Sequence, residues 1–402
     1  MSENLISNLL VMGSLIGAAL LLFHPKVSAN ATWRATVTPL ASIIGSGFLV
    51  LAPLLVRHFG TAAVWVMAGL CAVAYAVGAA IRWNILVLDE PEHRSALAAQ
   101  RIENLASWVL AFAYVISVCY YLTFLGAFAM SMTPFDGVTE GKVMTTAVLL
   151  FIALLGWRGG LKSLERAETY SVGIKLAVIA GLLAGMAYYA HLLAGKGQIQ
   201  HHAGQFDWDS VRLAFGLIIT VQGFETSRYL SEGHDARTRV RTMRYAQWLA
   251  TAVYLIYIGL AGVSFPVDSV GERETAVIGM TAAISPLLPV LLVVAALAAQ
   301  FSAAVADTNG CGGLTQEMSQ GRIHSRLAYL LLVAMALLLT WRANIYQIIS
   351  YASRAFALYY ALQCALATWT SHRRSGWNWR TMAFLALTIL MLAAAALGVS
   401  VE

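Results

Sequence analysis

Five ionisable side chains lie inside long apolar runs of the sequence, where a charge is costly and usually functional. Glu225 and Asp307 are acidic, and Lys175, Arg228 and Arg354 are basic. Such groups neutralise one another, move protons or hold a charged solute. An intramembrane aspartyl protease needs a second buried aspartate opposite Asp307, and no other aspartate of the sequence falls deep in an apolar run. The pattern therefore predicts a binding site rather than an enzyme, with no cofactor and no metal site.

The apolar run 35–56 carries two glycines around a serine near its centre, within Ile43–Phe48. Glycine weakens a helix, and a broken helix in hydrocarbon leaves N–H and C=O groups unpaired, each at a cost of several kcal/mol. Such a break is tolerated only where it is buried in protein or faces a ligand. The alternative is that Gly45 and Gly47 allow close helix packing, as small residues do in membranes.

A second run, 211–230, places a glutamine, a glycine and Glu225 at a similar depth. We expect this run to be interrupted near Gly223, as the first is near Gly45–Gly47. The alternative for Glu225 is a structural ion pair with Arg228, one helical turn further along. That pair alone would leave the adjacent glycine unexplained.

Two such breaks together suit a small solute that carries a carboxylate and an ammonium. Free N–H groups at the start of a half-helix favour the carboxylate, and free carbonyls near the second break favour the ammonium, so we expect an amino acid or a related amine. The candidate substrate-binding residues are Ile44, Gly45, Ser46, Gly47, Thr220, Gly223, Phe224 and Glu225. Side-chain selectivity would fall to Tyr114, Tyr120, Tyr121 and Ile219, unless these side chains serve only packing.

The composition places these residues in a membrane. Of the 402 residues, 59% are hydrophobic and 11% are charged, which indicates an all-α polytopic membrane protein. The net charge of +6 comes from basic residues in short loops, so no nucleic-acid partner is indicated. The four cysteines form no CxxC pair, and we interpret the pair His201–His202 as solvated surface. The twelve expected spans are 5–23, 36–56, 61–81, 104–130, 143–157, 169–191, 211–230, 245–264, 276–306, 325–341, 344–369 and 381–399.

The first span decides the orientation. Ala29–Ala31 looks like a signal-peptidase site, but the preceding segment has no basic n-region and its apolar run is too long, so we expect a retained helix. With the N-terminus outside the cytoplasm, most lysines and arginines fall in inner loops, as the positive-inside rule requires. We expect a multi-pass protein of the cell (inner) membrane whose partners are the bilayer and a small molecule. The sequence leaves the oligomeric state open.

The two breaks and the two cations recur at nearly the same offset. Gly223 follows Gly45 by 178 residues, and Arg354 follows Lys175 by 179. Paired broken helices are typical of transporters built from inverted repeats. The repeat predicts Lys175 beside the first break and Arg354 beside the second, paired with Glu225 or, failing that, with Asp307. The expected units are an extra helix and loop (1–34), a first five-helix repeat (35–191), a loop (192–210), a second repeat (211–370) and a C-terminal helix (371–402).

These motifs resemble the amino acid–polyamine–organocation (APC) superfamily over roughly residues 35–370. The family motif of the first core span, here 36–56, matches Ile43–Phe48. The motif of the sixth core span, here 211–230, matches Gly223–Glu225, with Glu232 and a basic loop after it. The lysine of the fifth core span, here 169–191, matches Lys175. The resemblance implies a LeuT-type 5+5 inverted-repeat fold with about twelve helices, and a permease that moves amino acids by alternating access. Ile219 stands where many members carry an aromatic gate, and Arg354 is not a family feature.

Coupling is inferred from the fifth and eighth core spans, here 169–191 and 276–306. A sodium site needs several oxygen ligands, and Ser302 is the only hydroxyl between Phe301 and Ala306. Lys175 could occupy that place instead, and burial disfavours the charged form of a lysine. We therefore expect proton coupling or exchange, with Lys175 and Ser302 as coupling residues and Arg354, Asp307 and Arg228 as a charge network. The alternatives are a channel or inorganic-ion carrier on the same fold and a non-transporting membrane receptor.

Overall fold

The computed structural model describes residues 3–45, 47–88, 97–158, 161–202, 204, 207–229, 235–271, 273 and 275–399, and the side chains of 161–170, 219, 229 and 268 lie outside this description. The regular elements of the described residues are α-helices and short 3₁₀ helices. In chain order they are α1 (Glu3–Leu22), α2 (Pro25–Ser28), α3 (Ala31–Ile43), α4 (Gly47–Phe59), α5 (Ala63–Val87), α7 (Leu97–Met130), α8 (Val138–Trp157), α9 (Leu161–Gly195), α10 (Trp208–Gly216), η1 (Ile218–Val221), η2 (Phe224–Tyr229), α11 (Ala236–Ser264), η3 (Val267–Ser269), α12 (Ala276–Ala282), α13 (Leu288–Met318), α14 (Ser325–Arg342), α15 (Ile345–Ser375) and α16 (Trp379–Leu397).

Nine of these helices are long and apolar enough to cross a membrane, and the bent pair α3–α4 makes a tenth. The two other expected spans correspond to the interrupted segment α10–η1–η2 and to α15, which is long enough but carries many polar residues. The expected span 276–306 is wrong as one helix. It consists of the short α12 and a separate α13, because Pro286 and Pro289 lie at their junction.

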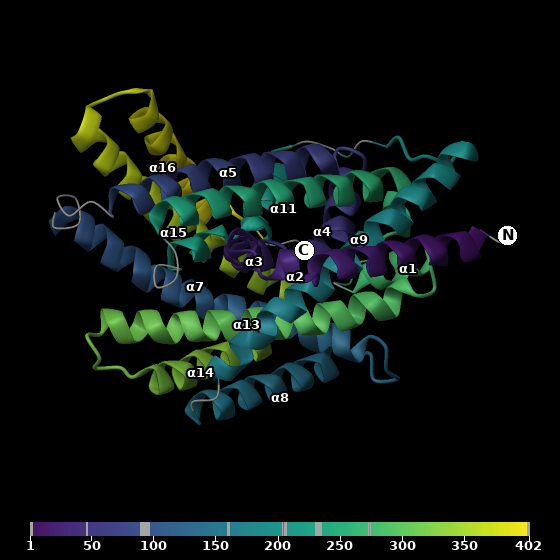
Figure 1. The fold of residues 1–402 in the computed structure, drawn as a ribbon, viewed down its shortest axis with the longest axis horizontal. Helices are drawn as coiled ribbons and strands as arrows, with labels where there is room; N and C mark the ends of the chain where they lie inside the picture. Colours follow the sequence, from purple (N-terminus) through teal and green to yellow (C-terminus); the bar gives the residue numbers. More distant parts are fainter. Residues whose placement is uncertain are drawn as a thin grey trace.

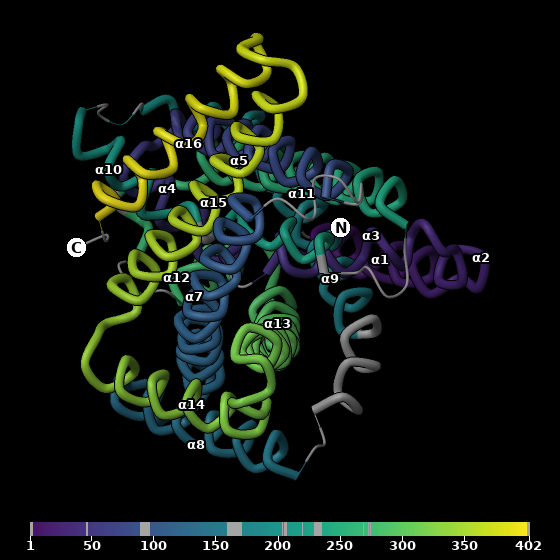
Figure 2. The backbone as a smooth tube through the Cα atoms, turned by 90° about the vertical axis from the view of Figure 1, so that its left-hand side faces the viewer, coloured from purple at the N-terminus to yellow at the C-terminus, as the bar shows by residue number. Residues whose placement is uncertain are grey.

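The long helices lie side by side in a layered bundle (Figure 1). α13 lies between α7 and α9 and is seen end-on near the centre of Figure 2. α8 and α14 pack together along one side, and α15 and α16 pack together on the opposite side, near α5. α11 packs on α5 and α3, so the two broken segments lie inside the bundle.

Local capping groups explain where several helices begin. α10 begins at a capping box in which the Asp207 carboxylate accepts from Ser210 N at 2.8 Å. α11 begins where the Asp235 carboxylate accepts from Thr238 N at 3.2 Å. Both carboxylates are outside the spans, and hydrogen bonds from Ser210 and from Thr238 lower their respective pKa values.

The additional N-terminal helix α1 packs along α9 and is anchored at the α12–α13 junction. The Ser7 hydroxyl donates to Ile284 O at 2.7 Å, and Ser285 lies 2.6 Å from the Asn8 side-chain oxygen. Gly185 of α9 permits the close packing of α1 on α9, since a Cβ there would lie 2.8 Å from the Val11 side chain of α1. α1 is therefore a structural part of the bundle.

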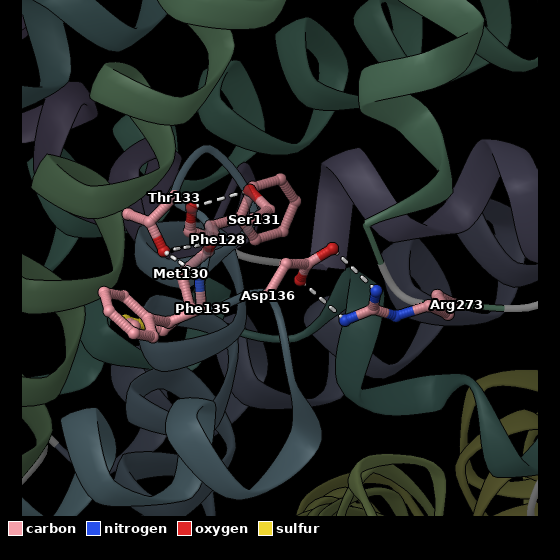
Figure 3. Close-up of polar contacts among 7 residues, drawn as sticks. All are labelled: Phe128, Met130, Ser131, Thr133, Phe135, Asp136 and Arg273. Atoms are coloured by element: carbon pink, nitrogen blue, oxygen red, sulfur yellow. Dashed lines mark hydrogen bonds and ion pairs between the residues drawn. The ribbon is translucent and has the colours of Figure 1, made fainter.

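The loop between α7 and α8 is tied to the loop before α12. Figure 3 shows Arg273 donating to both oxygens of Asp136, each at 2.8 Å. In the same loop the Thr133 hydroxyl donates to Met130 O at 2.8 Å and ends α7. The bidentate Asp136–Arg273 ion pair fixes two loops at one end of the bundle to each other.

Candidate functional site

The first break lies between α3 and α4, which are bent by 45° relative to each other. α3 ends at Ile43 and α4 begins at Gly47, so the interruption expected near Gly45–Gly47 is confirmed. Ser46, an expected binding residue, lies outside the described residues. Ile44 is fully buried at the end of α3 and breaks the helix with a ψ of 56°.

The second break lies between α10 and α11. After Gly216 the chain continues as the 3₁₀ turns η1 and η2, so the interruption expected near Gly223 is also confirmed. Gly223 has a φ of +111°, and a Cβ there would lie 2.5 Å from Ser42 and 2.7 Å from Ile43 N. Only glycine fits such a conformation at this spacing.

The two breaks are in direct contact. A Cβ on Gly47 would lie 3.0 Å from Thr220, so the absence of a side chain sets the distance between the segments. The Tyr254 hydroxyl of α11 lies 2.7 Å from Ile43 O and 2.7 Å from Thr220 O. The single proton of one buried hydroxyl is therefore shared between carbonyls at both breaks, where a broken helix in hydrocarbon needs donors.

Lys175 of α9 lies beside the first break, where the sequence placed it. Its ammonium donates to Ala41 O at 2.9 Å, and the residue is buried. It lines a cavity of about 20 Å³ with Gly45 and Phe48 and with Gln300 of α13. The Gln300 Oε1 atom is buried and has no hydrogen-bond partner among the described residues. Ser302 does not line this cavity, so Gln300 is the α13 side chain that sequence reasoning missed.

Glu225 is fully buried beside the second break. Its Oε2 atom accepts from Gly223 N at 2.9 Å and from the Tyr360 hydroxyl at 2.8 Å. Its Oε1 atom has no hydrogen-bond partner among the described residues, and the same is true of Gln222 Oε1. Phe224 stacks on Tyr360 with ring centroids 5.1 Å apart, which fixes the ring whose hydroxyl holds Glu225.

Asp307 provides a second buried carboxylate, on α13. It accepts a hydrogen bond from Ser117 of α7. Tyr121 of α7 accepts from the Gln222 side-chain amide at 2.9 Å and lies within electrostatic reach of both Asp307 and Glu225. The amide and the phenol therefore form a buried hydrogen-bonded pair next to the second break, with both carboxylates close enough to act on it electrostatically.

Of the other expected selectivity residues, Tyr114 and Tyr120 pack against aromatic rings. Tyr120 is buried in an aromatic cluster, edge-on to Phe124 at 4.9 Å between ring centroids. Tyr114 is buried and packs against Phe356, while Gly310 leaves room for its ring. The Ile219 side chain lies outside the description.

The expected place of Arg354 is wrong. Its side chain is exposed and donates to Ala395 O at 2.8 Å and to Ala396 O at 2.9 Å, in the last turn of α16. Successive helical residues point about 100° apart. Ser353 of α15 donates to Gly216 O and faces the second break, so Arg354 faces outward. The expected Arg354–Glu225 pair is therefore also wrong.

Arg228 also has a partner other than Glu225. It forms an ion pair with Glu103 of α7 at 2.5 Å and donates to the side chain of Gln363 on α15. Gln363 also accepts from Asn84 of α5 at 3.0 Å, and Arg239 donates to Arg228 O at 2.8 Å. No sequence signal marked Glu103, because this residue directly precedes the apolar run expected at 104–130.

Comparisons with known proteins agree with this architecture. A family model described as APC superfamily transporter matches residues 25–398. An uncharacterized protein of Aquifex aeolicus (strain VF5) is 37% identical over 396 residues, which cover 96% of this chain and 95% of that protein. Crystal structures of the Eremococcus coleocola manganese transporter, two of mutants and one in complex with an aromatic bis-isothiourea substituted compound, have TM-scores of 0.58, 0.59 and 0.56. Each is 12% identical in sequence and covers 91% of this chain and 87% of its own, so the likeness is one of fold. The family match and the Aquifex relative together establish that this chain belongs to the APC superfamily of transporters.

Proposed function

We propose that this transporter moves an amino acid or a related amine across the membrane by alternating access, with proton coupling or exchange. The observation that carries the proposal is the Glu225 Oε1 atom. It is a fully buried carboxylate oxygen beside the second break with no hydrogen-bond partner among the described residues. A buried carboxylate oxygen that no donor satisfies is costly, so an ammonium is the complementary group.

The rest of the site supports a zwitterion. Gly47 begins α4, so its N–H group and the positive end of the helix dipole are available to a carboxylate. The approach of Gly47 to Thr220 brings that helix end close to the second break. One small molecule could therefore contact α4 with its carboxylate and Glu225 with its ammonium.

Transport requires the two breaks to separate. Two cavities that described residues of the breaks line have volumes of about 20 and 10 Å³, about the size of one water molecule. An amino acid is larger than either of them, which supports a closed arrangement at these two places. Opening requires rupture of the Tyr254 bridge between Ile43 O and Thr220 O.

For coupling we propose Lys175. Its ammonium donates to Ala41 O beside the first break, where it supplies a positive charge without a bound sodium ion. Loss of one proton would leave a neutral amine that can still donate, but would remove the charge from this hydrogen bond and so weaken the hold of α9 on α3. The group therefore links a proton to the geometry of the break.

A second candidate function is transport of an inorganic cation. The unpartnered oxygens of Glu225 and Gln222 are ligands that a hard cation accepts, and the similar solved structures are of a manganese transporter. Within the described part of the chain, however, no group of three or more His, Cys, Asp or Glu residues could hold a metal ion, whereas the start of α4 suits the carboxylate of a zwitterion. We therefore favour the amine.

Uptake by proteoliposomes separates the two functions. The purified protein is reconstituted and supplied with labelled amino acids, labelled amines that lack a carboxylate, and Mn²⁺. Saturable uptake of an amino acid or amine that Mn²⁺ does not inhibit supports the proposal. Uptake of Mn²⁺ alone assigns the inorganic-ion function and overturns the proposal.

A further inference from the structure

A large cavity lies away from the breaks, on the outer face of the bundle. It has a volume of about 690 Å³, opens outward and is lined by residues of α7, α14, α15 and α16. Its walls include exposed large apolar side chains such as Phe112, Leu338 and Leu358. The volume is within the range of roughly 300–1,000 Å³ that is usual for ligand pockets.

Arg354 is the charged residue of this groove. A guanidinium carries five N–H donors. Two of them donate to Ala395 O and Ala396 O, and the others have no acceptor among the described residues. Those two carbonyls lie in the last turn of α16, so the guanidinium sits near one end of the helix rather than at the membrane centre.

An apolar groove with one arginine at the end of a helix matches an amphiphile with an anionic head. We propose that this groove binds an anionic phospholipid of the bilayer, with the phosphate on Arg354 and an acyl chain along α7, α14 and α15. Arginine binds phosphate oxygens through parallel N–H donors, which gives selectivity over a neutral headgroup. The apolar walls add affinity in proportion to the acyl-chain area that they cover.

The bound lipid would also have a structural consequence. The groove is formed by α15 and α16 on one side and by α7 and α14 on the other. α15 carries Tyr360, which holds Glu225, and α7 carries Tyr121. A lipid in the groove therefore contacts two helices of the candidate transport site from outside.

Native mass spectrometry of the full-length protein, released from nanodiscs of equal parts phosphatidylglycerol and phosphatidylcholine, tests the proposal. We expect retained phosphatidylglycerol and little phosphatidylcholine. Arg354→Gln should weaken phosphatidylglycerol retention by roughly tenfold, the effect of losing one charge-assisted contact. Leu358→Trp, which fills the groove and keeps the charge, should reduce it as well. Arg342→Gln, at an exposed arginine that does not line the groove, is the matched control.

Several results would overturn the proposal. Equal retention of the two lipids would show that Arg354 does not select the headgroup. Retention unchanged in both Arg354→Gln and Leu358→Trp would place the lipid elsewhere. A dimer that persists without anionic lipid, and whose subunits crosslink through cysteines introduced in the groove, would assign this face to a second copy of the chain. Because Leu358→Trp leaves the α16 carbonyl contacts of Arg354 intact, it remains informative if Arg354→Gln fails to fold.

Discussion

Replacing Tyr254 by phenylalanine should loosen the contact between the two breaks. The Tyr254 hydroxyl is fully buried and lies 2.7 Å from Ile43 O and 2.7 Å from Thr220 O. Its removal leaves two buried carbonyls without this donor, at a cost of about 1–3 kcal/mol to the closed arrangement. An open state competing with the closed one would then gain roughly tenfold or more in population.

The native thiol of Cys71 provides the assay for this substitution. Cys71 is buried and lines the same small cavity as Tyr254 and Ile43. In a background in which the other three cysteines are replaced by alanine, we expect Tyr254→Phe to raise the rate of Cys71 labelling by a membrane-permeant thiol reagent about tenfold, if labelling follows the open population. An unchanged rate would refute the role given to the hydroxyl.

Tyr257 provides the matched control, because it lies about one turn further along α11. Its hydroxyl donates to Leu49 O at 3.2 Å and so contacts only α4, not the second break. Tyr257→Phe also removes one buried hydroxyl. Equal labelling rates in the two variants would mean that loss of any buried hydroxyl loosens α11, and the bridge would then have no special role.

Two further substitutions test the geometry around the site. Gly223→Ala should prevent folding or remove transport, because the positive φ costs about 1–3 kcal/mol in a non-glycine residue and the new Cβ would meet the backbone of α3. A melting temperature in detergent equal to that of Gly279→Ala, whose Cβ meets nothing within 4 Å, would contradict this expectation. Glu103→Gln should lower the melting temperature because it weakens the 2.5 Å ion pair with Arg228. The partly buried position places the loss between those of exposed and buried pairs, at about 1–2 kcal/mol. Recovery in the swapped pair Glu103→Arg with Arg228→Glu would support a direct contact, and a swap no more stable than either single change would argue against it.

Much of the broken-helix geometry follows from the local sequence. Glycines beside polar residues at the centre of an apolar run favour an interruption, and the structure has one near Gly45–Gly47 and another near Gly223. Glycine alone is not sufficient, because α5 is continuous through Gly69 and Gly78. The place of Lys175 follows as well, because a long side chain at mid-span has few polar partners other than carbonyls freed by a break. These features depend on residue type and depth alone.

The failures concern which side of a helix faces the bundle. The repeat offset placed Arg354 one residue from Ser353, which contacts the second break, but an offset does not define which face of the helix a residue occupies. Because of that one-residue difference, the Arg354 side chain points to α16 instead of the second break. Gln300 and Glu103 were missed for a related reason. Each belongs to a site only because of a residue distant in sequence. Gln300 lines a cavity with Lys175, and Glu103 forms an ion pair with Arg228.

The measurement that tests the central claim most directly is amine uptake by Glu225→Gln in proteoliposomes, compared with Glu317→Gln at an exposed glutamate of α13. The substitution keeps the size of the side chain and removes the charge that we propose binds the ammonium. We predict that Glu225→Gln folds, as judged by its melting temperature, and that its KM for the amine rises at least tenfold, since a hydrogen bond to a charged group contributes about 1.5–3 kcal/mol. Glu317→Gln should transport like the unmodified protein. Unchanged KM and rate in a folded Glu225→Gln protein would contradict the account.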